Sequence, residues 1–526
     1  MAIIGQGVKR KTGERGSLTL SSAEREQGTY VIGTTGTGKT TLLRNIAVED
    51  MWNLPDEGLC VLDPHGDLTD ELLAWVPPNR IQDVVYLNPM DIVRPFGLNL
   101  LDCDRSSEHE VRWVVSTIME TLHRLFWYSW GPRLEHVLQH VIRTSMRVPD
   151  STFVELLLLL SNRAYRDEVV GYHKNRRKDG SIDTGRLDSQ KDGLLISFWH
   201  DWFQRLTPHD QAEATASTLN KLSPFLLDSM MRNIIGQAES SLDIRSIMDE
   251  GKILFVNLSK GDIGEINSSL LGSMLVNLIL IAALRRRGPG YATGRRRFHL
   301  IVDEYQNFAN QSFAILQSEA RKFGVDLIVA HQYRDQLDRD SQGASLNVGN
   351  FIVFRVSGRD SYMLASQFDN TPPPPDSRKE PIYAPVETQA GTLWQVYESD
   401  YSQRFFEEME LPRRSYNDVE AEMANSLSTL SNYEAYCRMV RKPRQGRPYL
   451  GEYKITTLEW PNVRTADGNQ GRPNAAVRDE CIKKSREQYG RDRDMVEQSI
   501  YERTGKRIEQ TGPVPAGGIV RRDKRT

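Results

Sequence analysis

The sequence has few cysteines, almost no net charge and no hydrophobic run long enough to cross a membrane. Its four cysteines are scattered, without Cys-x-x-Cys spacing or a Cys/His cluster. This spacing argues against structural zinc and indicates a reducing compartment. The 67 basic and 70 acidic residues leave a formal charge of −3, so the chain lacks the overall basic field of small nucleic-acid-binding proteins. Any contact with DNA must come from local patches.

The most membrane-like stretch runs from Ser269 to Leu284 and is followed by three arginines. It falls short of the roughly 20 apolar residues that span a bilayer, and Ser273 and Asn277 interrupt it. We therefore expect a buried helix here. The first residues contain only a short apolar run followed by charge, which is not the pattern of a signal peptide. We expect a cytoplasmic protein with no transmembrane segment of its own.

One glycine-rich stretch, Gly33 to Thr40, fits the pattern G-x-x-x-x-G-K-[ST]. A short β-branched run precedes it and apolar residues at helical spacing follow it, so a chance match to a glycine-rich turn is disfavoured. Such a loop turns successive backbone N–H groups toward an anion, while its lysine adds positive charge and its last hydroxyl can complete a Mg²⁺ shell. The sequence therefore predicts a site for a nucleoside triphosphate and Mg²⁺. The candidate binding residues are Gly33, Thr34, Thr35, Gly36, Thr37, Gly38, Lys39, Thr40 and Thr41.

A second apolar strand, predicted at 298–302, ends in Asp303 and Glu304. Beside a phosphate-binding loop, the aspartate can hold Mg²⁺ together with Thr40. The adjacent glutamate can polarise the attacking water as a general base.

Two further strand ends carry polar residues. The predicted strand 325–330 ends in His331 and Gln332; the amide can contact both the attacking water and the γ-phosphate, or it can cap the strand end. The strand 58–62 ends in Asp63, which lies at the ligand-binding edge of an open α/β sheet or closes an Asx turn on its own backbone.

At 526 residues and 39% apolar composition, the chain is expected to form about two to four domains. Residues 104–243 carry long amphipathic stretches and almost no strand pattern, which predicts an all-helical domain inserted into the sheet. The aromatic cluster at 126–130 favours a helical core over a base-stacking surface. The strand-bearing domain comprises 29–103 and 244–410, preceded by an N-terminal segment at 1–28.

The remaining features lie toward the C-terminus. Residues 380–410 are expected to return to the sheet as short strands. Residues 411–526 form a polar extension with a predicted helix at 475–504 and, from Gly505, a disordered basic tail. The loop 285–297 holds six arginines in 13 positions and could either grip DNA phosphates or be a solvated hairpin.

Taken in order, five motifs resemble those of the FtsK/HerA superfamily of DNA-pumping ATPases. The motifs are Gly-Thr-Gly-Lys-Thr, Asp63-Pro64-His65-Gly66-Asp67, Val302-Asp303-Glu304, Glu319-Ala320-Arg321-Lys322 and His331-Gln332. Within the superfamily they are most similar to the TraG/TraD-like coupling ATPases of conjugative type IV secretion. The resemblance covers roughly residues 20 to 410.

The resemblance implies an α/β fold, the RecA-like ASCE P-loop ATPase sheet, in a homohexameric ring around DNA. It assigns Lys39 and Thr40 to the Walker A motif, Asp303 and Glu304 to the Walker B motif, and Gln332 to the sensor. Arg321 matches the arginine finger that reaches a neighbouring subunit's site, with Arg355 as the reserve candidate; a helix C-terminal partner is the alternative reading of Arg321. A relaxase or a secretion-channel protein is the implied protein partner.

This chain departs from the group in lacking the membrane-spanning helices with which coupling proteins usually begin. The predicted function is nonetheless an ATP-driven DNA translocase. Two alternatives remain: a secretion-system ATPase that moves protein substrates, and a scaffold whose assembly is gated by nucleotide.

Overall fold

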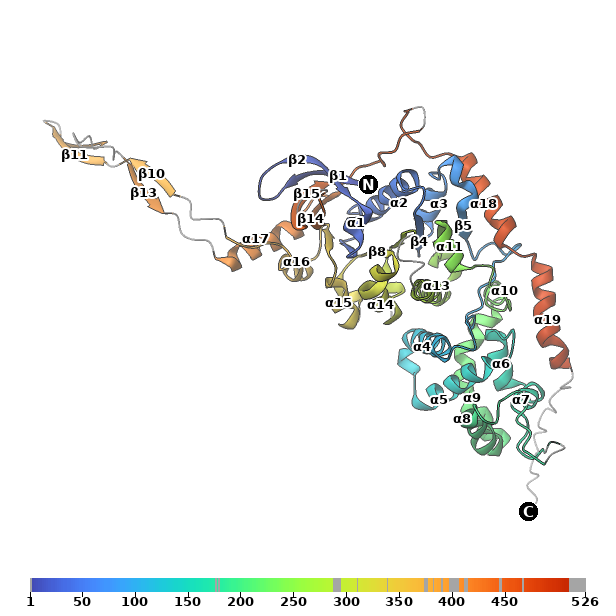
Figure 1. Cartoon of the computed structure of the whole chain (residues 1–526). Helices are drawn as coiled ribbons and strands as arrows, with labels where there is room; N and C mark the ends of the chain where they lie inside the picture. Colours follow the sequence, from blue (N-terminus) through green and yellow to red (C-terminus); the bar gives the residue numbers. More distant parts are fainter. Residues whose placement is uncertain are drawn as a thin grey trace, which may run out of the picture.

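The computed structural model is organised around one eleven-stranded mixed sheet (Figure 1), with strand order β2-β1-β15-β14-β9-β3-β8-β7-β4-β6-β5. The strands from β9 to β5 run parallel and those from β2 to β14 run antiparallel. The strands of this sheet are β1 (Ala2–Lys9), β2 (Arg15–Leu20), β3 (Thr29–Ile32), β4 (Gly58–Asp63), β5 (Val84–Leu87), β6 (Ile253–Asn257), β7 (Phe298–Val302), β8 (Val325–His331), β9 (Asn350–Val353), β14 (Glu434–Arg441) and β15 (Tyr449–Thr456).

Helices cover both faces of the sheet and form a separate lobe. The helices are α1 (Ser22–Arg25), α2 (Lys39–Asn53), α3 (Asp67–Leu73), α4 (Glu108–Leu125), α5 (Pro132–Ser145), α6 (Phe153–Ser161), α7 (Arg163–Val170), α8 (Gly193–Ser197), α9 (Pro208–Leu227), α10 (Ser229–Ile235), α11 (Ile244–Glu250), α12 (Lys260–Ile263), α13 (Glu265–Arg285), α14 (Gln311–Glu319), α15 (Arg339–Leu346), α16 (Gly358–Ala365), α17 (Tyr416–Ser428), α18 (Ala475–Tyr489) and α19 (Arg493–Glu509). The structure describes residues 2–175, 177, 180–286, 295–309, 311–337, 339–372, 377–381, 383–388, 391–396, 406–410, 415–443, 447–465 and 468–509.

The central parallel strands are buried along their whole length, which explains their continuous apolar sequences. Successive side chains of β3 point to opposite faces. Val31 therefore joins the core under α2 and α3, whereas Tyr30 and Ile32 join the core shared with α13 and the helical lobe. The predicted α/β fold is confirmed, with its central strands at the predicted positions.

The region between β5 and β6 is helical, as the sequence predicts, and holds α4 to α10. Its apolar residues form one continuous core with the α13 face of the sheet. Polar contacts add to this packing: Thr117 of α4 donates to the side-chain oxygen of Asn277 at 2.8 Å, and Arg124 donates to the carbonyl of Asn307 at 2.7 Å. The lobe is therefore firmly attached to the sheet beside β7.

The aromatic cluster of the helical lobe differs from the prediction. Phe126 is buried, but Trp127 and Tyr128, in the turn after α4, are each 72% exposed. The expectation of an aromatic core is wrong for these two residues, because the short turn that follows Phe126 directs them away from the helices.

Both ends of the chain contribute to the main sheet, beyond the limits expected at residues 28 and 411. β1 and β2 come from the N-terminal segment, and β14 and β15 come from the C-terminal extension. β14 pairs antiparallel with β9, and Tyr436 of β14 lies opposite Val353 of β9. Buried and half-buried residues alternate along β14, as in a strand with one covered face.

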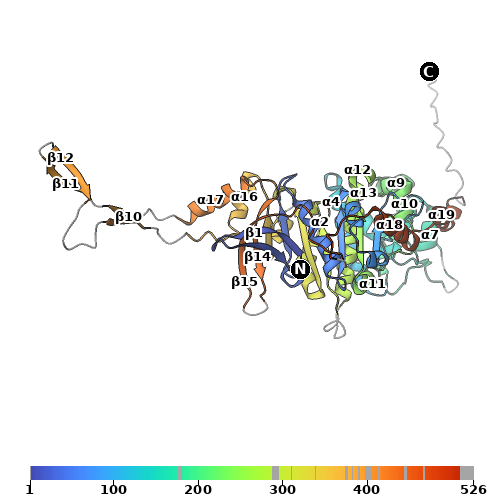
Figure 2. The ribbon, with the colours of Figure 1, turned by 90° about the horizontal axis from the view of Figure 1, so that it is seen from above.

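Strands between 377 and 410 form, but they do not return to the main sheet. β10 (Ser377–Pro381) pairs with β13 (Phe406–Glu410), and β11 (Tyr383–Thr388) pairs with β12 (Gly391–Val396). These two-stranded sheets lie apart from the rest of the chain (Figure 2). The prediction that they rejoin the sheet is wrong; β14 occupies the edge beside β9 instead.

Within the described residues, the helix α13 is long and apolar enough to cross a membrane. However, 83% of its apolar 18-residue window is buried inside the protein. The single helix predicted at 475–504 is divided at Gly490 into two helices, α18 and α19. The prediction of a disordered tail from Gly505 is wrong for residues 505–509, which are the end of α19, and the rest of the tail lies outside the described residues.

Candidate nucleotide-binding and hydrolysis site

The glycine-rich loop lies between β3 and α2 and is tied to both neighbouring strands. The backbone N–H of Gly33 donates to the carbonyl of His331 at 3.3 Å, and that of Thr34 donates to the carbonyl of Arg355 at 2.8 Å. Gly38 ends the loop at φ 109°, a conformation that a side chain would strain. The loop therefore opens α2 at the carboxyl edge of the sheet, where its N–H groups can receive phosphate. Thr41 follows in the first turn of α2 and is half-buried.

Lys39 is folded back over its own loop. Its ammonium donates to the carbonyls of Gly33 at 2.7 Å and Thr34 at 3.2 Å. Burial lowers the pKa of Lys39, and the carboxylates of Glu304 and Asp303 oppose that shift. The charge of the lysine therefore lies close to both acidic residues of β7.

Asp303 and Glu304 follow β7 and meet this loop. The Thr40 hydroxyl donates to Asp303 Oδ2 at 3.1 Å. Burial, followed by repulsion from Glu304 and Asp63, raises the pKa of Asp303 to about 6. A buried carboxylate that its neighbours destabilise is a site where a cation would compensate. The pair of hydroxyl and carboxylate oxygens suits Mg²⁺, so Thr40 and Asp303 fit the metal that the sequence predicts.

Glu304 lies in the left-handed region, at φ 44°, which a non-glycine residue rarely adopts. Two amides hold its carboxylate: Gln332 donates to Oε1 at 2.9 Å and Gln306 donates to Oε2 at 2.7 Å. Backbone strain of this kind persists only where neighbouring contacts impose it. The conformation and both amides fix the position of the glutamate carboxylate.

Gln332 links the acidic residues to the glycine-rich loop. Its amide nitrogen donates to Glu304, while its oxygen accepts from the Thr35 hydroxyl at 3.0 Å. The preceding His331 is fully buried against Tyr30. Burial, together with Arg334 and Lys39, lowers the pKa of His331 to about 3, so its imidazole is neutral.

Asp63 forms the Asx turn that was weighed as its alternative role. Its carboxylate accepts from the backbone N–H of His65 at 2.9 Å and of Thr69 at 3.0 Å. It also lies close enough to Asp303 to raise the pKa of that residue.

The two candidates for the arginine finger lie at opposite ends of the parallel strands. Arg321 precedes β8, and its guanidinium is 3.7 Å from Glu26, which precedes β3. It is more than half exposed at the edge away from its own glycine-rich loop. Arg355, in contrast, lies beside that loop and donates to the carbonyl of Leu430 at 3.2 Å and to Asn432 at 2.9 Å.

The described arginines of the loop 285–297 donate to groups of the same chain. Arg285 pairs with Glu110, and Arg297 pairs with Glu26. Arg286, Arg295 and Arg296 donate to backbone carbonyls. Arg287 lies outside the described residues. These contacts occupy the side chains that could otherwise grip phosphates.

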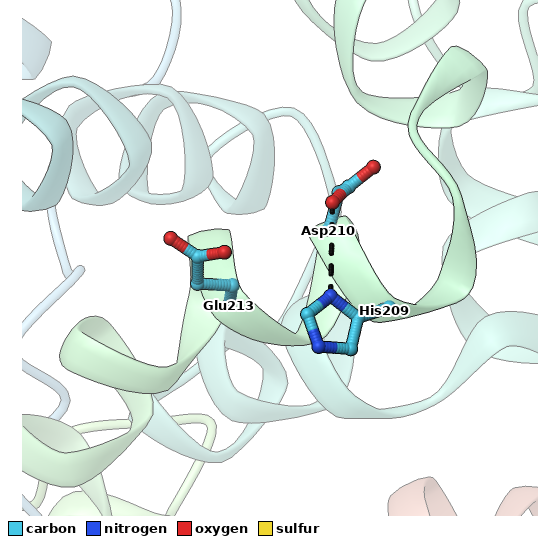
Figure 3. Close-up of side chains that lie close together, drawn as sticks. All are labelled: His209, Asp210 and Glu213. Atoms are coloured by element: carbon cyan, nitrogen blue, oxygen red, sulfur yellow. Dashed lines mark ion pairs between the residues drawn. The ribbon is translucent and has the colours of Figure 1, made fainter.

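Figure 3 shows His209, Asp210 and Glu213 in the first turn of α9, where their ligand atoms lie within 4.8 Å of one another. The sequence predicts no metal site here. All three are exposed, and Glu213 pairs with Arg133 at 2.9 Å. We assign no site to them.

Two contacts near the loop had no signal in the sequence. Gln306 holds Glu304, as described above, and Tyr433 lies against Gly38, where a Cβ would be 2.8 Å from the tyrosine ring. Gln306 lies in a single 3-10 turn and Tyr433 in the connection before β14, and neither segment is long enough for periodicity to give information.

The structure thus combines an open α/β sheet with a glycine-rich loop between β3 and α2, at the carboxyl ends of its parallel strands. No protein-family model matches the sequence, and no curated protein matches it. Solved structures do match. The unbound conjugative coupling protein TrwB has a TM-score of 0.52 at 14% identity, covering 88% of this chain and 96% of that one.

Two liganded structures of TrwB are equally similar. The complex with ADP and Mg²⁺ gives a TM-score of 0.52 at 14% identity, over 91% of this chain and 98% of that one. The complex with the non-hydrolysable ATP analogue ADPNP gives 0.51 at 16% identity, over 88% and 97%. The resemblance to the coupling ATPases is therefore confirmed for the fold.

Proposed function

We propose that this protein is a cytoplasmic ATPase that couples ATP hydrolysis to the movement of DNA and works as a homohexameric ring. The observation that carries the proposal is the bridge made by Gln332, which joins Thr35 of the glycine-rich loop to Glu304. One amide thus contacts the phosphate-binding loop and the base candidate together. The likeness to TrwB, solved with ADP and Mg²⁺ and with ADPNP, supports the choice of nucleotide.

In this proposal the loop from Gly33 to Thr41 binds the triphosphate. Lys39 exchanges its two backbone carbonyl partners for phosphate oxygens. Thr40 and Asp303 would hold Mg²⁺, which supplies charge neutralisation at the phosphates when bound. The burial and the acidic neighbours that raise the pKa of Asp303 would make a bound cation favourable there.

Glu304 is the proposed general base. It accepts a proton from the attacking water as the water oxygen bonds to the γ-phosphorus and the bond to the leaving ADP oxygen breaks. Gln332 orients that water, and its contact with Thr35 reports the occupancy of the phosphate site. Because Gln306 and Gln332 hold the carboxylate in place, the base needs no rearrangement before the reaction.

Arg321 is the proposed finger, and it acts on the next subunit. Its place before β8 prevents it from reaching its own phosphate loop, whereas its exposure leaves it available to a neighbour. An arginine supplied in this way stabilises charge on the transferred phosphoryl group. Arg355 is the weaker candidate because its guanidinium already bonds residues 430 and 432 of its own chain.

ATP hydrolysis by the full chain, measured with and without single- and double-stranded DNA on fractions of known ring size, tests the proposal. DNA should stimulate turnover in ring fractions and not in monomers. Stimulation by a protein partner alone would replace the DNA motor with a secretion ATPase. Slow turnover that no partner changes would favour the nucleotide-gated scaffold.

A further inference from the structure

Tyr433 joins the C-terminal segment to the phosphate-binding loop. It follows α17 and directly precedes β14, which pairs with β9 beside the loop strand. Its backbone N–H donates to the carbonyl of Thr37 at 2.8 Å. Its ring lies against Gly38, whose missing side chain leaves room for that contact. A residue that follows the loop by nearly 400 positions in the sequence thus completes it.

The backbone of Tyr433 is held in a strained conformation. Its φ is 65°, one of three positive values among the described non-glycine residues, and another of these is Glu304. Its carbonyl accepts from the Thr457 N–H at 2.8 Å and from the Thr457 hydroxyl at 3.1 Å, so both sides of the residue are fixed. A large aromatic residue in this region is unusual and points to a role for its position.

The side chain is only partly used for packing. Tyr433 is 47% exposed, although its backbone is pinned by three hydrogen bonds. The strain therefore presents a half-open aromatic surface beside the loop. If the ring served only the core, burial would be its expected state.

The arrangement of the strands fixes the direction of a bound nucleotide. Asp303, Glu304 and Gln332 lie on the β7 and β8 side of the loop strand, so the γ-phosphate must point that way. The nucleoside then leaves the loop on the other side. The strands on that side are β9 and β14, and Tyr433 stands at the loop end of β14.

We propose that the ring of Tyr433 receives the base of the bound nucleoside triphosphate by stacking. The inference rests on the proposed function, because it assumes that the loop binds a triphosphate. Stacking uses the π-face that every base has, so it is tolerant of base identity. The site therefore binds nucleoside triphosphates without selecting adenine through Tyr433.

The test is the dissociation constant of the full chain for MgATP, MgGTP and magnesium tripolyphosphate, measured by titration calorimetry. Tyr433→Gly removes the ring and suits the positive φ, and Tyr433→Asn removes it with a residue that tolerates this region. Both variants should bind ATP and GTP about 5- to 100-fold more weakly, and tripolyphosphate with unchanged affinity. Tyr433→Phe should retain wild-type affinity.

Tyr416→Ala is the matched control, since Tyr416 is 49% exposed on α17 away from the loop. The inference is overturned if both ringless variants bind ATP like the wild type, while the proposed function then stands. Equal weakening of tripolyphosphate and ATP also overturns it, because the ring would then support the loop only. A wild-type chain that binds neither ATP nor tripolyphosphate sinks the proposed function and this inference together.

Discussion

Replacing Glu304 by glutamine tests the chemistry at the centre of the site. In the native arrangement each carboxylate oxygen accepts one amide hydrogen bond, from Gln332 at 2.9 Å and from Gln306 at 2.7 Å. A glutamine offers one oxygen and one NH₂ group, so one of the two amides loses its acceptor unless its side chain flips to present its oxygen. The substitution keeps the size of the side chain but removes the base and disturbs one hydrogen bond.

General-base catalysis contributes about 10² to 10⁴ in rate, so Glu304→Gln should lower kcat by that factor. The affinity for MgATP should change by less than about threefold, because no oxygen of Glu304 bonds the glycine-rich loop directly and a carboxylate-to-amide change of equal size leaves the cradle intact. Single-turnover hydrolysis and calorimetric binding on the same preparation separate the two effects. Glu213→Gln, on the exposed turn of α9, is the matched control. Parental turnover in Glu304→Gln would refute the assignment of the base.

Three further predictions follow from the site and its supports. Arg321→Ala should lower the ATPase rate of rings by about 10³ or more. Mixing Arg321→Ala subunits with Glu304→Gln subunits should restore turnover, because some interfaces then pair an intact finger with an intact base. The absence of restoration in verified mixed rings would count against a finger acting in trans. Gly38→Ala should weaken MgATP binding at least tenfold, because its Cβ would lie 2.8 Å from the Tyr433 ring at φ 109°; unchanged calorimetric affinity would contradict this. His299 lies buried between Asp326 and Glu57. Although burial opposes its charge, these carboxylates raise the pKa of His299 from 6.5 to about 10. The charged imidazole therefore contributes to stability below about pH 6.5, and this contribution is lost as the pH rises through about 10. Urea unfolding should show a fall in the unfolding free energy across this pH range, and the fall should be smaller in His299→Gln.

The sequence predicts the central parallel strands well because each is a short, largely apolar run that is followed by a glycine or a polar residue. That pattern depends only on burial of both faces of the sheet. The positions of the phosphate-binding loop and of Asp303-Glu304 follow from this pattern of strands, since polar residues after parallel strands must meet at one edge of the sheet. The contacts made by Thr40 and Gln332 agree with that expectation.

The antiparallel part of the sheet was not predicted, because β14 and β15 are half-exposed and rich in charged residues. Their place is decided by pairing with a distant strand, which local periodicity does not encode. The same reason explains why Tyr433 was missed: its position depends on β14 reaching β9. Exposure of Trp127 likewise depends on the path of one turn, not on composition.

The strand β8 connects the two halves of the proposed mechanism. Arg321 lies just before it and Gln332 just after it, so its seven residues separate them by about 23 Å. All seven residues are buried and both neighbouring strands are parallel, so the strand cannot bend or slide independently. In a ring, a displacement of Arg321 by a neighbour's phosphate must therefore move the strand or be resisted by it. If the strand moves, the state of one site reaches the amide of the next, and β8 then couples neighbouring sites in the proposed ring; if the strand resists, this route carries no signal.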